Sequence, residues 1–475
     1  MSAAIHVDPL ESGELEDVDL ENAGPLDTTR KANPDEAKKN QHRSRFLSPV
    51  CVVVLLLVIL VVVITLSIKH ARSKTDTTAE SLRACSWQRL VPPDESEKKK
   101  FGAILAVDDK TIAVAAQGDA SNGPDSGAAY VFRLDKDTGK FKFHDKLIPH
   151  DGKEGDVAQY TDVSGKFVVL GAKKHDHRGE SSGAVYVFME KGNGEFIEEA
   201  EILPAELEAG DMLGNQLAID GKTLLIGARR TNEGRGAVYA YHRTRGRWKP
   251  YGEVILPTGV QLIDDEFGGR INFQGKTAVI TKNGPNGHWS DAGSAYIFQD
   301  NGQGFQQLQQ LFPDEIGFDN YAKKAVDISQ DEATVVIGAH KTDLTGAYKG
   351  FVYVFTRGDD GMYYQSDKIM PEKENKDYLF GHDVALRGNL LLVLAETAHE
   401  EGNTGLVYVF ARESETEGWA QQTTLTRDES LPSSIDGFGS SLAILDDRTV
   451  VIGSRYTESS SGLDKSGSAY VIKLC

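Results

Sequence analysis

Short apolar runs separated by turn residues recur along most of the chain, and the stretch from Leu213 to Tyr241 shows the unit most clearly. Its first two runs are joined by Asp220-Gly221, a hairpin signal because both residues tolerate a positive φ. The second run is apolar throughout, as expected of an inner strand that is covered on both faces. A fourth run follows a glycine-bearing turn and ends at Pro257. The unit therefore predicts four antiparallel strands, at residues 213–219, 223–228, 237–241 and 248–256.

The same pattern opens seven times, at intervals of 54–59 residues. Four antiparallel strands repeated seven times predict an all-β, seven-bladed β-propeller, whose blades pack face to face around a central channel. A two-sheet sandwich is the alternative, but it does not account for a regular period held seven times. The seven openings are Phe101-Gly102, Val157-Ala158, Leu213-Gly214, Phe267-Gly268, Tyr321-Ala322, Phe380-Gly381 and Phe438-Gly439.

The two ends of the repeat array complement each other. The last unit stops after its third run, Ser468 to Leu474, whereas the fragment Cys85 to Pro92 precedes the first opening and resembles a fourth strand. Because unpaired strand edges invite aggregation, we expect this N-terminal strand to complete the seventh blade and close the ring. Cys85 and Cys475 would then be cross-strand neighbours, and we predict a disulfide between them. Two free thiols are the alternative; the third cysteine, Cys51, lies inside an apolar run.

The residues before the repeats divide into three predicted segments. Residues 1–45 bury too little apolar surface to offset the entropy of ordering, so we expect a disordered cytoplasmic tail. Residues 46–68 carry no charge, and a helix of that length, at about 1.5 Å per residue, crosses a hydrocarbon core of about 30 Å. We therefore predict a single transmembrane helix at 46–68, a polar stalk at 69–84 and the propeller at 85–475.

Charges indicate the orientation of this predicted helix and the kind of partner. Six Lys or Arg residues precede the helix and four follow it before the propeller, a positive-inside bias that favours a cytoplasmic N-terminus. We expect a single-pass protein of the plasma membrane or an endomembrane, with its propeller outside the cell or in a lumen. The formal charge of −19 argues against a nucleic-acid partner, which would require a basic face. A site for an anion must therefore be local.

The Phe-Gly openings and the second-strand endings Gly171-Ala172, Gly227-Ala228 and Gly338-Ala339 resemble the FG-GAP repeat, the unit of the seven-bladed propeller of integrin alpha subunits. The resemblance covers residues 85–475 and implies an extracellular recognition platform, often adhesive. Calcium-binding members of the family carry several acids in the turn between the first and second strands. Most of the corresponding turns here carry one acid or none, so we expect no calcium in the blades. The predicted anchor precedes the propeller, and we therefore do not expect an integrin subunit.

The residue directly after each second-strand ending is predicted to face the channel mouth, at the base of a polar loop. Such loops on rigid scaffolds often carry function. Cations are frequent at this position although the chain is acidic, which suggests a local site for a carboxylate, a sulfate or an acidic glycan. Trp289 is added because an exposed aromatic ring can anchor a protein or stack on a sugar. Solvated loop residues without a ligand are the alternative. The predicted ligand-binding residues are Lys173, Arg229, Asn283, His340, Arg455 and Trp289.

Metal and catalytic signals are weak. His175, Asp176 and His177 carry donors suited to a transition metal. Two His residues separated by one position on a loop are more often unliganded, so we predict no metal site and no cofactor. The sequence has no H-E-x-x-H motif and no cysteine-rich metal spacing, and we predict no catalytic residue. Acids just before the openings, such as Asp156 and Asp211, recur at one structural position, which indicates turn capping.

The sequence thus predicts a membrane protein whose propeller binds a protein or an acidic glycan on its loop face, for adhesion or recognition. The enzyme alternative is a hydrolase with its site at the channel mouth, because propellers also host enzymes. A structural surface component without a specific ligand is the third alternative.

Overall fold

The computed structural model describes residues 81–259, 261–284, 293–314, 321–340, 350–373, 378–397, 405–414, 417–426, 437–458, 462–463 and 465–475. The chain divides into two units, residues 1–78 and 79–475, and every described residue belongs to the second. The predicted tail, the predicted helix at 46–68 and most of the predicted stalk lie outside the described residues. Within the described part of the chain, no helix is long and apolar enough to cross a membrane.

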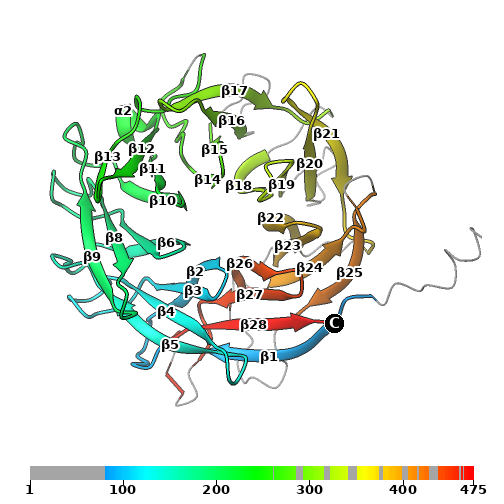
Figure 1. Ribbon diagram of the computed structural model, residues 1–475, viewed down its shortest axis with the longest axis horizontal. Helices are drawn as coiled ribbons and strands as arrows, with labels where there is room; N and C mark the ends of the chain where they lie inside the picture. The colour runs from blue at the N-terminus through cyan, green and yellow to red at the C-terminus, as the bar shows by residue number, and fades with distance from the viewer. Residues whose placement is uncertain are drawn as a thin grey trace, which may run out of the picture. The chain divides into compact units, whose positions relative to one another are not determined.

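The described strands form seven four-stranded antiparallel sheets, one for each predicted unit, arranged as a ring (Figure 1). In six sheets the four strands are hydrogen-bonded in chain order, and the seventh combines both ends of the array. This is the seven-bladed β-propeller that the repeat pattern predicts. In each blade the first strand lies next to the ring centre and the fourth strand lies at the rim, because each hairpin places the next strand further from the centre (Figure 1).

The blades are numbered by unit. Blade 1 contains β2 (Phe101–Asp108), β3 (Thr111–Ala116), β4 (Ala128–Asp135) and β5 (Lys140–Leu147). Blade 2 contains β6 (Ala158–Ser164), β7 (Phe167–Ala172), β8 (Ala184–Glu190) and β9 (Phe196–Ile202). Blade 3 contains β10 (Leu213–Asp220), β11 (Thr223–Ala228), the short helical turn α2 (Thr231–Gly234), β12 (Ala237–Thr244) and β13 (Arg247–Pro250). Blade 4 contains β14 (Ile271–Gln274), β15 (Thr277–Lys282), β16 (Ser294–Asp300) and β17 (Phe305–Leu311).

The remaining blades follow the same order. Blade 5 contains β18 (Tyr321–Ile328), β19 (Thr334–Ala339), β20 (Phe351–Arg357) and β21 (Tyr363–Ile369). Blade 6 contains β22 (Tyr378–Arg387), β23 (Leu390–Thr397), β24 (Gly405–Ala411) and β25 (Ala420–Leu425). Blade 7 contains β26 (Phe438–Asp446), β27 (Thr449–Ser454), β28 (Ser468–Leu474) and β1 (Ala84–Leu90).

The ring closes where the sequence predicts. Strand β1 pairs with β28 along its whole length, so the N-terminal end supplies the missing fourth strand of blade 7. Cys85 and Cys475 form a disulfide, with Cα atoms 5.9 Å apart. Arg83 and Cys475 exchange a pair of backbone hydrogen bonds beside it, at 3.0 Å each. The closure thus joins residues 390 positions apart in the chain.

The core is divided among the blade interfaces. Seven clusters of buried hydrophobic side chains fill the spaces between neighbouring blades. Phe101, at the first opening, is completely buried and contacts the ring of Tyr130 edge-on, with centroids 5.5 Å apart. Burial of one such side chain stabilises the fold by about 1.5–3 kcal/mol. No blade could bury both of its faces without its neighbours.

The repeated glycines allow adjacent blades to approach closely. A Cβ at Gly171, in the second strand of blade 2, would lie 2.2 Å from the carbonyl oxygen of Gly214 in blade 3. Gly214 itself has a φ of +82°, in the left-handed region that favours glycine. The same contact joins Gly453 of blade 7 to Gly102 of blade 1, at 2.1 Å. The opening glycine and the second-strand glycine are therefore two halves of one interblade contact.

Two details differ from the sequence prediction. The fourth strand of blade 3 ends at Pro250, not near Leu256, because proline has no N–H group for the ladder and Gly252 follows with a positive φ. Pairing resumes only as a bridge between Val238 and Ile255. In blade 2 the residue that pairs as Phe101 does is Ala158 and not Val157, which shifts that opening by one position.

The acids in the turns between first and second strands bind neighbouring blades. The Asp220 carboxylate accepts a hydrogen bond of 2.7 Å from the N–H group of Gly275 in the next blade. The Asp108 carboxylate accepts the N–H group of Gly165 in the same way. These acids connect consecutive turns around one end of the ring.

Candidate ligand site at the mouth of the central channel

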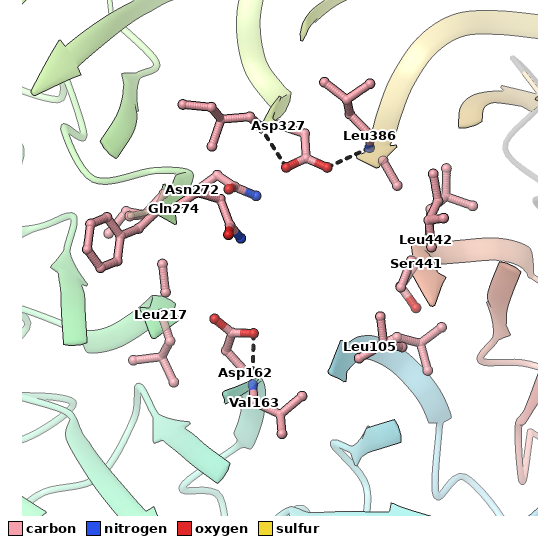
Figure 2. A pocket seen from close by; sticks show the side chains of 18 of the residues that line it. Leu105, Asp162, Val163, Leu217, Asn272, Gln274, Asp327, Leu386, Ser441 and Leu442 are labelled. Carbon is pink, nitrogen blue, oxygen red and sulfur yellow. Dashed lines mark hydrogen bonds between the residues drawn. The ribbon is translucent and has the colours of Figure 1, made fainter. Parts of the chain in front are cut away.

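The first strands of all seven blades line a central channel that encloses about 370 Å³ (Figure 2). Apolar side chains such as Leu105, Leu217 and Leu442 share its wall with polar ones such as Asn272 and Ser441. First strands hold these positions because they are the innermost strands of the blades. The channel is therefore a narrow space with hydrogen-bonding groups on its wall.

Asp162 and Asp327 lie on different sides of this channel, and each joins two blades (Figure 2). Asp162 accepts N–H groups from Val163 in its own strand and from Ile219 in blade 3, at 2.8 Å each. Asp327 makes the same pair of bonds, the second one with Leu386 of blade 6 at 2.7 Å. Both carboxyl groups thus link the first strands of neighbouring blades through hydrogen bonds.

Burial raises the pKa of both carboxyl groups to about 7, although their backbone hydrogen bonds lower it. The charges of nearby acids raise it further, among them Asp108 for Asp162 and Asp383 for Asp327. The side chains of Asp162 and Asp327 keep partial exposure, but to the channel and not to bulk solvent. Protein on all sides therefore still disfavours their charged forms.

A second cavity, of about 490 Å³, continues from the channel on the face that carries the loops between second and third strands. It shares residues such as Gln216 and Arg270 with the channel, and we call it the mouth cavity. Its volume lies in the range of pockets that hold small ligands, about 300–1,000 Å³. Its charged lining residues include Arg229, Arg270 and Arg455 together with the acids Asp383 and Glu396, and Gln117 and Asn283 add amide groups.

Three arginines surround the mouth cavity. Arg229 lies 3.6 Å from a carboxylate oxygen of Glu266, a loose ion pair at one side. Arg270 and Arg455 have no ion pair within the described part of the chain. The guanidinium group of Arg455 lies 4.8 Å from the ring centre of Tyr456. The Nε atoms of Arg229 and Arg455 are buried and have no hydrogen-bond partner among the described residues. Buried donors without partners cost about 1–3 kcal/mol each, which an anionic ligand would offset.

The structure brings three of the six predicted ligand-binding residues together. Arg229, Asn283 and Arg455 all line the mouth cavity, as their position after the second strand predicts. Asn283 donates a hydrogen bond of 2.8 Å from Nδ2 to Glu266, and its buried Oδ1 has no partner. These three come from blades 3, 4 and 7, so they meet only because the propeller is closed.

The other three predicted residues are placed differently. Lys173 lies over the ring of Tyr160, a mouth residue, with Nζ 5.3 Å from the ring centre. Burial lowers the pKa of Lys173, and the positive charge of Arg229 lowers it further. His340 is buried behind the mouth, with its ring 5.1 Å from that of His382. Trp289 lies outside the described residues.

Sequence reasoning missed the cavity residues that lie on first strands or their bulges. Arg270 is the clearest case, together with His382, whose Nε2 lies 2.6 Å from a carboxylate oxygen of Glu396. A signal exists in the repeat: the third residue after the opening is polar in several units, as Gln216 and Arg270 show. An alignment of the seven units on that position would have found Arg270.

The predicted turn caps are confirmed at the described positions. The carboxylates of Asp156, Asp211 and Asp265 each accept a backbone N–H three residues earlier, at 2.6, 2.8 and 2.7 Å. Gly179 to Gly183 match the G-x-S-x-G spacing of a nucleophile elbow. They lie in the loop between two antiparallel strands, β7 and β8, without the strand-to-helix turn that this motif requires. The segment therefore carries no indication of catalysis.

One group of residues in the described part of the chain has donors suited to a metal ion: Asp151, His175, His177 and Glu201. It contains both histidines that the sequence singled out. Asp176 does not belong to it, and its carboxylate accepts the N–H group of Ser181. The group lies in blade 2 and is separate from the mouth cavity.

The repeat sequence defines the class of this domain. The FG-GAP repeat profile matches residues 86–132, 196–241 and 419–472. The chain therefore carries FG-GAP repeats arranged as a seven-bladed β-propeller, as the resemblance of its openings implies. No curated protein sequence matches the chain.

Solved structures with a similar arrangement are distant in sequence. One is a candidate 6-phosphogluconolactonase from Bacteroides uniformis, 12% identical, with a TM-score of 0.46, covering 69% of this chain and 86% of that one. Another is the periplasmic gluconolactonase from Pseudomonas aeruginosa, 12% identical, with a TM-score of 0.42, covering 72% of this chain and 96% of that one. At this level of similarity neither relative informs the function of this chain.

Proposed function

We propose that the propeller is a recognition domain that binds an anionic ligand in its mouth cavity. The observation that carries this proposal is the set of three arginines around one cavity, two of them with buried Nε donors that have no partner. A guanidinium group offers a planar array of donors that matches carboxylate and sulfate oxygens. These three arginines form a local group of cations on a chain whose formal charge is −19.

The chemistry of the lining favours an acidic glycan or an acidic side chain of a protein. Gln117 and Asn283 supply amide groups beside the arginines, and Tyr160 supplies a ring face. Amides can bind sugar hydroxyls or peptide groups, and an aromatic face can stack on a sugar ring. A cavity of about 490 Å³ accepts the tip of such a ligand, while the surrounding loops would contact the rest.

We also propose that the propeller is displayed by a single-pass membrane anchor, with adhesion or recognition as its role. Support comes from the sequence: the 23 uncharged residues at 46–68 and the excess of Lys and Arg before them. Epitope accessibility on intact and permeabilised cells tests the topology. An N-terminal tag accessible only after permeabilisation, with a C-terminal tag accessible before it, is expected for plasma-membrane display.

Substitution of the mouth arginines should weaken anion binding. We expect Arg229→Ala and Arg455→Ala each to lower the affinity for a sulfated oligosaccharide roughly 10–150-fold, because a hydrogen bond to a charged group contributes about 1.5–3 kcal/mol. The measurement is binding of the whole 475-residue chain to a sulfated and acidic glycan array, followed by titration calorimetry with the best oligosaccharide. Affinity should fall as salt concentration rises.

Arg247→Ala is the matched control, because Arg247 is exposed on the rim strand β13, outside the mouth cavity. Equal loss in this variant, or equal binding of the desulfated oligosaccharide, would show that the interaction is not the one proposed. Conversion of the oligosaccharide during incubation would instead favour the hydrolase alternative. If no array member depends on Arg229 or Arg455, the proposed site is wrong.

A further inference from the structure

The loop after β7 brings two imidazoles to two carboxylates that are distant from it in sequence. His175 and His177 lie in this loop, Asp151 lies in the connection from β5 to β6, and Glu201 lies in the outer strand β9. One ligand atom from each of the four residues lies within 4.8 Å of the other three. His175 is 2% exposed, whereas His177 reaches the surface. The cluster is thus partly enclosed and accessible from one side.

The distances are close to those of a tetrahedral metal site. Nε2 of His175 lies 3.3 Å from Oδ2 of Asp151, and Nδ1 of His177 lies 3.6 Å from Oε1 of Glu201. Nδ1 of His177 and Oδ2 of Asp151 are 4.0 Å apart. Ligand atoms at about 2.0–2.1 Å from a tetrahedral ion are about 3.3 Å from each other. Small side-chain rotations would therefore bring all four atoms to one ion.

The residues behind the cluster hold the donors in position. Nδ1 of His175 lies 3.0 Å from a carboxylate oxygen of Asp156, which directs Nε2 toward the cluster. The hydroxyl of Tyr186 donates a hydrogen bond of 2.6 Å to Oδ1 of Asp151, which leaves Oδ2 for an ion. Histidine ligands of metals usually make such a second contact with a carboxylate. Oε1 of Glu201 is buried, and no described residue forms a hydrogen bond with it.

Blade 1 contains the same arrangement with different charges. Its Tyr130 hydroxyl bonds Asp94 as Tyr186 bonds Asp151, and Asp119 occupies the position of His175. Two lysines complete that cluster: Nζ of Lys99 is 2.9 Å from Asp94 and 3.1 Å from Asp119, and Nζ of Lys146 is 2.6 and 2.9 Å from them. In blade 1 each carboxylate is therefore neutralised by ammonium groups from the chain itself.

Blade 2 replaces both of these cations by acids. Glu201 pairs with Tyr186 across the strands, as Lys146 pairs with Tyr130 in blade 1. Asp156 lies two residues before Ala158, and Lys99 lies two residues before Phe101. Ala158 and Phe101 are equivalent, because each pairs with the last residue of the second strand in its blade. No Lys or Arg pairs with Asp151, Asp156 or Glu201 within the described residues. Within the described residues, the basic groups that contact these three carboxylates are imidazoles alone, which leaves a deficit of positive charge.

We propose that Asp151, His175, His177 and Glu201 bind a divalent transition metal, with Zn²⁺ as the preferred ion, and that Asp156 and Tyr186 orient two of these ligands. Imidazole and carboxylate donors suit Zn²⁺, and four protein ligands make a closed, structural type of site. The ion supplies the charge that Lys99 and Lys146 supply in blade 1. It also ties the β7–β8 loop, which begins at Lys173 beside the mouth, to the outer strand of the blade.

The test is titration of the whole 475-residue chain, without a polyhistidine tag and after treatment with a chelator, with Zn²⁺ alone. We expect one ion bound per chain, a higher Tm with Zn²⁺ and no effect of Ca²⁺, which imidazole does not favour. Co²⁺ should give the intense visible absorption of a tetrahedral centre. His175→Ala should lower the Zn²⁺ affinity at least 100-fold, and Asp156→Ala about 10–100-fold. His144→Ala is the matched control, because the His144 ring contacts the Gly194 carbonyl and the Phe196 ring and does not belong to the metal cluster.

Glu201→Lys separates metal binding from folding. This variant introduces the residue that blade 1 has at the same position, so its ammonium group should replace the ion. We expect it to fold with a Tm at least equal to that of the metal-free parent and to show no response to Zn²⁺. If the cluster is an ion pair between imidazolium and carboxylate groups only, the parent chain will bind no Zn²⁺ and its Tm will not change, which would overturn the proposal. Equal loss of affinity in His144→Ala would also overturn it.

Discussion

Raising the pH from about 4.5 to about 8 should lower the free energy of unfolding of the propeller through two channel carboxyl groups. Asp162 and Asp327 have a folded-state pKa of about 7, above the ordinary value of 3.8. Between these two values the folded chain binds more protons than the unfolded chain, so stability falls as the pH rises. Their contribution is fully present below about pH 4 and is lost through about pH 7.

The size of this effect follows from the linkage relation. Each group contributes at most about 1.4 kcal/mol per pH unit, and water in the channel narrows the pH range over which this slope applies. Urea unfolding across the pH range measures it, with the whole chain and with the double variant Asp162→Ala/Asp327→Ala. Alanine is the residue that blade 3 has at this position, as Ala218. We expect the free energy of unfolding to fall less steeply with pH in the double variant than in the parent chain, by about 1.4–2.8 kcal/mol per pH unit.

The comparison between variants isolates the two carboxyl groups. His150 and Glu201 also have raised pKa values, so the parent chain has a background slope of the same sign that the double variant retains. Asp137→Ala, at an exposed turn position, serves as the control and should leave the slope unchanged. Identical slopes for the parent and the double variant would show that the two carboxyl groups ionise freely in the folded state.

Loss of the disulfide should produce the second large effect. Cys85 and Cys475 are 390 positions apart, so their bond restricts nearly the whole unfolded propeller. By the loop-entropy argument, Cys475→Ser should lower the free energy of unfolding by roughly 5 kcal/mol. The closure strand β1 would then be held in blade 7 by its hydrogen bonds and side-chain packing alone. Hydrogen exchange should accelerate first in β1 and β28.

Urea unfolding of the whole chain under oxidising conditions measures this loss, and a reducing agent should bring the parent to the stability of the variant. Cys51→Ser is the matched control, because Cys51 lies in the predicted membrane segment and not in the disulfide. Equal unfolding midpoints for the parent and Cys475→Ser would contradict the prediction. Loss of stability in the Cys51 variant would point to a general effect of cysteine removal.

The repeat and its closure could be predicted because local sequence encodes them. Apolar runs of strand length, the Asp220-Gly221 turn and the regular spacing of the openings each act within a few residues, and seven copies make the pattern unambiguous. The closure followed from a missing fourth strand at one end and a spare one at the other. The role of Gly214 did not follow, because its contact with Gly171 depends on how two blades stack.

The candidate ligand site was predicted in part for the same reason. Arg229, Asn283 and Arg455 occupy one position of the repeat, so a closed ring necessarily brings them to one face. Arg270 was missed because it lies just before the first strand β14, where the direction of a side chain depends on local backbone geometry. The channel carboxylates were missed because only the closed ring removes them from bulk solvent.

By itself, the sequence determined the number of blades, the strand order within them, the closing strand and its disulfide, because turn chemistry, period and cysteine position are local properties. Only the tertiary structure decided which side chains share a cavity. His175 and His177 were visible as a pair, but Asp151 and Glu201 reach them from a blade connection and an outer strand. The contact between these four side chains depends on the stacking of blades and the register of strands. Both are set by small rotations and shifts over tens of residues, so no short stretch of sequence specifies the contact.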